Sequence, residues 1–254
     1  MKNAFYLALA FTLIYGTACA PRELTKPYKE EKISLLYSES VGDAAKPQPW
    51  EIYNDLITIK KGTPHLIWKE IDNKTYVLVS TWQSDTVYYK NNLQTGTYNT
   101  GEHALWITTA PELQTLCSQK SFGRKEGLNL RLEQLLGLPP NAGKKFFIEF
   151  WVQPQDLFRP CLDSEVSEAN CTLAFPDDES LAHKKWINYL RLASYYNPEW
   201  NKNYPWTQLG YTYDWHPKNK SHIGLSEFVI GKNKEIIVHR VYTTDQYCEV
   251  ASER

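Results

Sequence analysis

The N-terminus constrains this chain more than any other feature, because it predicts the compartment in which the rest must fold. Lys2 supplies a positive charge, residues 4–15 form an apolar run, and Gly16 to Ala20 are mostly small. This order of charge, apolar block and small residues is typical of a secretory signal. The apolar run is too short to span a bilayer comfortably. We therefore expect residues 1–18 to be a signal peptide and the remainder to fold outside the cytoplasm, in the cell envelope (outer membrane or periplasm) or as a secreted protein.

The cleavage region gives a second expectation. Cleavage after Ala20 would leave Pro21 first, which signal peptidases process poorly, whereas cleavage after Ala18 leaves Cys19 first. The sequence Gly16-Thr17-Ala18-Cys19 resembles a bacterial lipobox, although Gly16 stands where an aliphatic residue is usual. The resemblance implies lipidation of Cys19 and attachment to a membrane. Residues 19–30 are charged and contain proline, and we expect them to form a tether between the membrane and the domain.

The cysteine count agrees with this interpretation. The chain has five cysteines, and an odd number leaves one thiol unpaired in an oxidising compartment. If Cys19 carries lipid, an even set remains for disulfides: Cys117, Cys161, Cys171 and Cys248. Four cysteines allow three pairings, and the sequence does not choose among them. A metal site is the weaker alternative, because the chain has no Cys-x-x-Cys and no histidine at ligand spacing from a cysteine, so no metal is expected.

Strand and helix patterns predict one α+β domain over residues 31–254, with a mixed or antiparallel sheet, two or three helices and long aromatic loops. β-branched and aromatic residues indicate strands at residues 33–37, 56–59, 76–82, 86–90 and 105–108. Residues 146–152 predict a central strand that is mostly apolar on both faces. Residues 224–230 and 236–242 predict a closing hairpin.

Helices are expected at three places. Thr109-Ala110-Pro111-Glu112 has the form of a capping box, in which Thr109 accepts from the backbone and Glu112 reaches back. Residues 128–136 place four leucines on one side before Gly137. Residues 180–196 form the longest helical pattern, with Trp186, Tyr189, Leu190 and Ala193 expected to face inward.

Aromatic residues are the first candidates for function. The chain has nine Trp and seventeen Tyr, and several fall in a segment whose prolines and glycine favour loop structure. Rings on loops can stack on sugar faces or other apolar ligands, so a glycan or protein ligand is the partner that we expect. The alternative is that these rings fill an irregular core. The candidate ligand-binding residues are Trp200, Trp206, Tyr211, Tyr213 and Trp215.

Two acids within apolar strands, Glu149 and Glu227, are the candidate catalytic groups. Burial beside aromatic or aliphatic neighbours would raise the pKa of either carboxyl toward the range of a general acid or base. The alternative is that each faces solvent or pairs with an arginine such as Arg191 or Arg240. Asp214, His216 and His222 are a weaker candidate, for a metal site on a loop. A histidine on a loop is more often solvated than bound to a metal.

Two resemblances bear on function. The segments 130–140, 205–215 and 224–228 resemble a set of uncharacterised bacterial exported proteins, which implies an origin but no activity. Residues 226–230 and 236–238, with 79–82, resemble the C-terminal strands and the Ser-Thr-Ser-type strand of ADP-ribosyltransferase-like folds. That resemblance implies NAD as substrate and Glu227 as the residue that orients the nicotinamide ribose. No cofactor is expected otherwise, and nucleic-acid binding is not expected because basic residues are scattered.

Overall fold

The computed structural model describes residues 26–93, 96–199 and 202–249. In these ranges the chain forms an α+β domain, which confirms the expected fold class. The helices are α1 (Lys26–Ala44), η1 (Pro49–Glu51), α2 (Val87–Asn92), α3 (Ala110–Cys117), α4 (Leu128–Leu135), η2 (Pro154–Asp156), α5 (Leu181–Tyr195) and α6 (Thr244–Glu249). The strands are β1 (Trp68–Ile71), β2 (Lys74–Gln83), β3 (Thr97–Asn99), β4 (Leu105–Thr109), β5 (Phe146–Val152), β6 (Leu157–Phe158), β7 (Tyr211–Tyr213), β8 (Ile223–Ser226), β9 (Phe228–Ile230) and β10 (Glu235–Thr243).

The main sheet is antiparallel and strongly curled. Its strand order is β3-β10-β5-β2-β4-β9-β6, with β1 paired to β2, while β7 and β8 form a separate pair. Strands β9 and β10 lie four places apart in this order, yet only residues 231–234 connect them. Such a short connection requires the sheet to curl until these two strands approach each other. The hairpin predicted at 224–242 is therefore wrong, because β9 pairs with β4 and β6 while β10 pairs with β3 and β5.

The connecting residues 231–234 form hydrogen bonds with segments other than β9 and β10. The Gly231 N–H donates to the Asp156 carbonyl oxygen, and the Asn233 N–H donates to the Gly101 carbonyl oxygen. The Thr100 hydroxyl donates to the Gly231 carbonyl and accepts from the Lys234 N–H. Segments distant in the sequence thus satisfy the polar groups that a β9–β10 ladder would have used.

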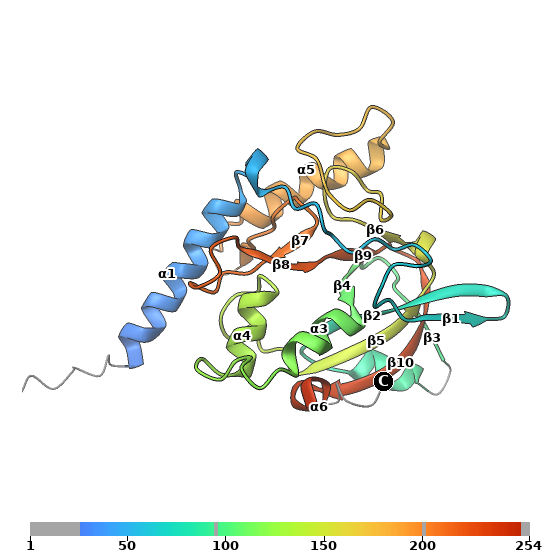
Figure 1. Ribbon diagram of the computed structural model, residues 1–254, viewed down its shortest axis with the longest axis horizontal. Helices are drawn as coiled ribbons and strands as arrows, with labels where there is room; N and C mark the ends of the chain where they lie inside the picture. Colours follow the sequence, from blue (N-terminus) through green and yellow to red (C-terminus); the bar gives the residue numbers. More distant parts are fainter. Residues whose placement is uncertain (1–25, 94–95, 200–201, 250–254) are drawn as a thin grey trace, which may run out of the picture.

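The central strand β5 has the two faces that its sequence predicts. Ile148, Phe150 and Val152 face the inside of the curl and pack in one core cluster. Phe147 and Trp151 belong to clusters on the outer face. Helices α3, α4 and α6 pack on one part of that outer face, and α5 packs against Trp106 of β4. Figure 1 shows α5 well separated from the other three helices.

Helix α1 takes the place of two predicted features. Residues 33–37 belong to helix α1, since the buried or partly buried Ile33, Leu36, Tyr37 and Ala44 recur at helical rather than strand spacing. The tether expected at residues 19–30 already becomes helical at Lys26, and its earlier residues lie outside the described ranges. Figure 1 shows α1 reaching away from the rest of the fold.

Short segments account for the other differences. Residues 86–90 lie at the start of helix α2 rather than in a strand. Residues 56–59 form no strand, although the Leu56 and Ile59 N–H groups donate to the carbonyls of Ala169 and Val166. The described residues contain six α-helices instead of two or three, because α1, α2 and α6 have no clear sequence signal.

The three predicted helices form, with corrections of detail. At the start of α3 the Thr109 hydroxyl donates to the Glu112 carboxylate at 3.3 Å, so the expected capping box is absent. Helix α4 ends at Leu135, and Gly137, two residues further on, has a φ of 64°, the left-handed value that glycine tolerates. On α5 Trp186 and Leu190 pack inward as expected, but Tyr189 is 69% exposed.

The four cysteines form two disulfides. Cys117 pairs with Cys248 and Cys161 with Cys171, with Cα–Cα distances of 5.1 Å and 6.3 Å. Both distances lie in the normal range for a disulfide. The first bond joins α3 to α6, and the second closes a short loop. Disulfides of this kind fit an oxidising extracytoplasmic environment. Within the described ranges, no helix is both long and apolar enough to cross a bilayer.

Candidate functional site

A cavity of about 550 Å³ opens on the outer face of the sheet, between the two groups of covering helices. Strands β2 and β4 form its floor, α5 and residues 202–206 form one wall, and residues 136–138 form another. A volume of this size suits a small organic ligand. The lining is mainly apolar and aromatic and includes Trp82, Trp106, Phe147, Leu190, Tyr204 and Trp206.

One row of polar side chains crosses the floor of this cavity. Ser80 on β2 lies opposite Thr108 on β4 in the strand register. Continuing the β4–β9 register by one residue sets Glu227 opposite Thr108. Ser80, Thr108 and Glu227 all line the cavity. The sheet pairing therefore places three polar groups, from segments far apart in the sequence, side by side on an otherwise apolar floor.

The row continues on its other side to Glu149, which lies opposite Ser80 on β5. Glu149 is completely buried and is not among the residues that line the cavity. Glu149 and Glu227 are three strand spacings apart, roughly 14 Å. Paired carboxylates that hydrolyse glycosides are about 5–9.5 Å apart. The two candidate acids thus lie in one row but are too far apart to act as such a pair.

Glu227 is the most unusual group in the cavity. The residue is partly exposed and lines the cavity. Burial raises the pKa of the Glu227 carboxyl to about 8. In the described part of the chain, no hydrogen-bond donor or cation contacts this carboxyl. Glu227 is therefore mostly protonated at neutral pH when the cavity is empty.

Two further groups extend the polar character of the cavity. The Ser80 hydroxyl is buried and has no hydrogen-bond partner among the described residues. Lys144 also lines the cavity, and burial lowers its pKa. Sequence reasoning missed Lys144 and Thr108 as site residues. Neither of them left a clear signal, because even Thr108 stands in the run Leu105-Trp106-Ile107-Thr108-Thr109, which does not alternate polar with apolar residues.

The aromatic residues singled out in the sequence are in the core. Trp206, Tyr211, Tyr213 and Trp215 are at most 5% exposed, and Tyr211 and Tyr213 belong to strand β7 rather than to a loop. Their polar atoms donate to the protein itself, at Pro160, Glu51, Asp43 and Leu138 respectively. Trp206 and Tyr213 also line the cavity, whereas Tyr211 and Trp215 do not. Trp200 lies outside the described residues.

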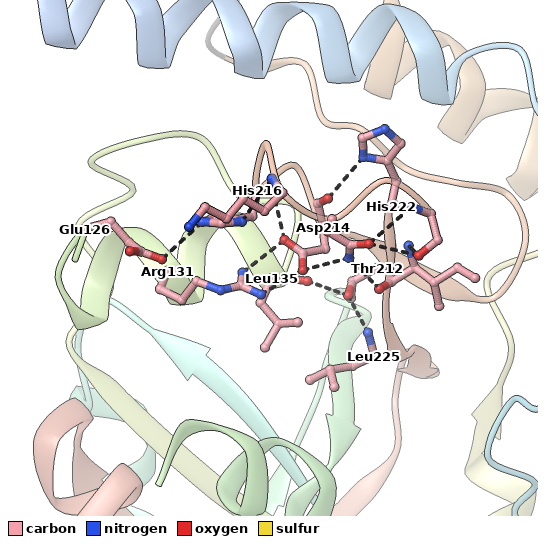
Figure 2. A network of polar contacts seen from close by, with 12 residues as sticks. Glu126, Arg131, Leu135, Thr212, Asp214, His216, His222 and Leu225 are labelled. Carbon is pink, nitrogen blue, oxygen red and sulfur yellow. Dashed lines mark hydrogen bonds and ion pairs between the residues drawn. The ribbon is translucent and has the colours of Figure 1, made fainter. Parts of the chain in front are cut away.

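Asp214 and its neighbours form a second polar cluster, shown in Figure 2. The Arg131 guanidinium donates two hydrogen bonds to the Asp214 carboxylate, at 3.0 and 2.8 Å. The same carboxylate accepts from the His216 backbone N–H and from the Asn219 side chain. Each carboxylate oxygen of Asp214 thus accepts two hydrogen bonds, and together these bonds hold the loop after β7 against α4.

The histidines of this cluster also have structural partners. Burial, followed by the nearby Arg131 charge, lowers the pKa of His216, so its 3.4 Å contact with Glu126 joins a neutral ring to a carboxylate at pH 7. His222 stacks on Tyr213 and contacts the Asp214 carbonyl. The described residues contain no group of three acidic, histidine or cysteine side chains arranged to hold a metal ion. We interpret this cluster as a loop anchor.

Comparisons with protein-family models, with curated proteins and with solved structures found no match to this chain.

Proposed function

We propose that this protein binds a small, partly apolar organic ligand in the Glu227 cavity, and that it does so outside the cytoplasm. The observation that carries the proposal is the combination of a 550 Å³ apolar cavity with a polar row along its floor. Apolar walls supply the affinity, while a few convergent polar groups fix the orientation of the ligand. The buried aromatic residues of the core then support the wall of the site.

A fluorescent probe tests this proposal. N-phenyl-1-naphthylamine is uncharged at neutral pH and fluoresces strongly in apolar surroundings, so we expect it to bind in the cavity. Ala193 on α5 lines the cavity, and Ala193→Trp should fill part of it and weaken probe binding by about tenfold or more. Ala182 lies exposed on the same helix, so Ala182→Trp is the matched control and should bind as the wild type does. Equal binding by the two variants would contradict the proposal.

The location outside the cytoplasm is supported by the two disulfides and by the signal-like N-terminus. We further propose that Cys19 carries lipid and anchors the protein to the cell envelope. Detergent phase partitioning checks this: the full chain should enter the detergent phase, and Cys19→Ser should remain in the aqueous phase. Equal partitioning of the two would exclude the anchor and leave a secreted form.

An ADP-ribosyltransferase-like enzyme is the second candidate. The observation that favours it is that Ser80, Thr81 and Glu227 line the same cavity, as the resemblance to that superfamily implies. NAD would then be the substrate and Glu227 the residue that contacts the nicotinamide ribose. The test is NAD hydrolysis by the wild type and by Glu227→Gln. Absence of turnover by the wild type would eliminate this candidate without affecting the binding proposal.

A further inference from the structure

Glu227 lies at the aromatic end of the cavity, and no basic side chain of the described residues pairs with it. Trp106 lies on the same face of β4 as Thr108, and it is therefore a diagonal cross-strand neighbour of Glu227. Diagonal neighbours are within reach of an aromatic side chain. Trp106 packs near Trp186, with ring centroids 6.2 Å apart, which fixes its position.

A second ring system borders the same carboxyl from the α5 side. Tyr195 stacks on Trp206 with ring centroids 6.1 Å apart, and its hydroxyl donates to the Trp206 carbonyl. Electrostatic interaction with Glu227 contributes to raising the pKa of Tyr195, after the larger effect of burial, so the two groups are near each other. Trp206 and the half-exposed Tyr204 both line the cavity.

The basic groups nearby are already engaged or lie elsewhere. Lys202 at the rim forms an ion pair with Glu199, with a nitrogen–oxygen distance of 2.8 Å. The Arg191 guanidinium donates to the Gln208 and Asn188 side chains. Lys144 also lines the cavity, and the acid that interacts with it electrostatically is Asp85 rather than Glu227. No cation of the described residues thus neutralises an ionised Glu227.

We propose that the Glu227 end of the cavity binds the ammonium group of a small organic amine, with the carboxylate as its counter-ion and the Trp106, Trp206 and Tyr204 rings around it. A cation held against aromatic faces is attracted by their negative charge density. A carboxylate in a partly desolvated cavity adds an ion pair that is stronger than one in water. This inference rests on the proposed ligand-binding function and names the class of ligand.

The protonated state of the empty site does not prevent such binding. With a carboxyl pKa of about 8, about a quarter of the molecules are ionised at pH 7.5, which weakens binding of a cation by only about fourfold. A desolvated cation–aromatic contact together with an ion pair can offset a penalty of this size.

Three molecules of nearly equal shape test the proposal: phenethylamine, 2-phenylethanol and phenylacetate, which are cationic, neutral and anionic at pH 7.5. We expect calorimetric titration of the full protein to give an affinity for the amine about tenfold or more above that for the alcohol, with the anion weakest. Glu227→Gln should remove the preference for the amine. Glu112→Gln is the matched control, because Glu112 is another buried acid but does not line the cavity, and it should keep the preference.

The outcomes separate this inference from the proposed function. Equal affinity of the wild type for the amine and the alcohol would overturn the inference and leave the proposed ligand binding intact. The same conclusion would follow if the naphthylamine probe bound but none of the three test molecules did. Failure of the probe and of all three molecules to bind would overturn both. The comparison within the wild type decides the question even if a variant does not fold.

Discussion

At the residue scale, the strongest charged contact is the one between Arg131 and Asp214. The carboxylate is almost completely buried and the guanidinium is 16% exposed. Removing one member of such a pair leaves the other without its partner in a poorly solvated place, which costs much more than the pair contributes.

We therefore expect Asp214→Asn to lower the free energy of unfolding by about 3 kcal/mol. The exposed pair Lys202–Glu199 provides the comparison, and Lys202→Met should cost less than about 0.5 kcal/mol. Urea unfolding curves measure both. Similar losses for the two variants would show that the Asp214 cluster does not anchor its loop.

Glu227 gives a prediction about pH at the same scale. Burial raises the pKa of Glu227 to about 8 and that of Glu112 to about 7, from an ordinary value of 4.5. The folded state holds both protons more tightly than the unfolded chain does. The stability that they contribute is therefore complete below pH 4.5 and is lost as the pH rises through 7 and 8.

Unfolding measurements between about pH 5 and about pH 9 should show wild-type stability falling more steeply than that of Glu227→Gln. In the Glu227→Gln variant, the pH dependence of stability comes only from Glu112 and from other groups. Parallel curves would mean that Glu227 titrates as an ordinary carboxyl, and the description of the cavity would then be wrong.

At the scale of elements, the two disulfides differ in what they hold. The Cys117–Cys248 bond closes a sequence separation of 131 residues and joins α3 to α6, whereas Cys161–Cys171 closes a separation of 10. Loop-closure entropy predicts contributions of about 5 and about 3 kcal/mol respectively. Thermal unfolding of the two Cys→Ala double variants checks the order, and a larger loss for the short loop would contradict it.

The elements that the sequence predicts correctly are those with a complete local signal. Residues 146–152 have an unbroken apolar pattern, and residues 128–137 have both a helical period and a terminal glycine. Residues 33–37 misled the prediction because a window of five residues cannot distinguish β-branched strand composition from one face of a long helix. The 224–242 hairpin failed because its pairing depends on how the whole sheet curls, which no local signal encodes.

At the scale of the whole molecule, the candidate site is a product of topology. Glu227 was a sequence candidate because it is an acid among apolar residues, but its neighbours could not be predicted. Ser80, Thr108 and Glu227 are separated by many residues, and only the strand order β2-β4-β9 brings them into one row. The sequence showed how many aromatic residues the chain has, but it did not show where they lie. Tyr211 and Trp215, for example, pack entirely inside the fold.

Glu227 is a partly buried acid that pairs with no donor or cation among the described residues, and we propose that a cationic ligand supplies its counter-ion. Carbon-13 NMR of the glutamate carboxyls measures this directly, with the Glu227 signal assigned by its absence in Glu227→Gln. We expect the free protein to give a pKa of about 8 for Glu227, and saturating phenethylamine to move that pKa back toward its ordinary value. A Glu227 pKa near 4.5 in the free protein, or one that the amine leaves unchanged, would contradict the account.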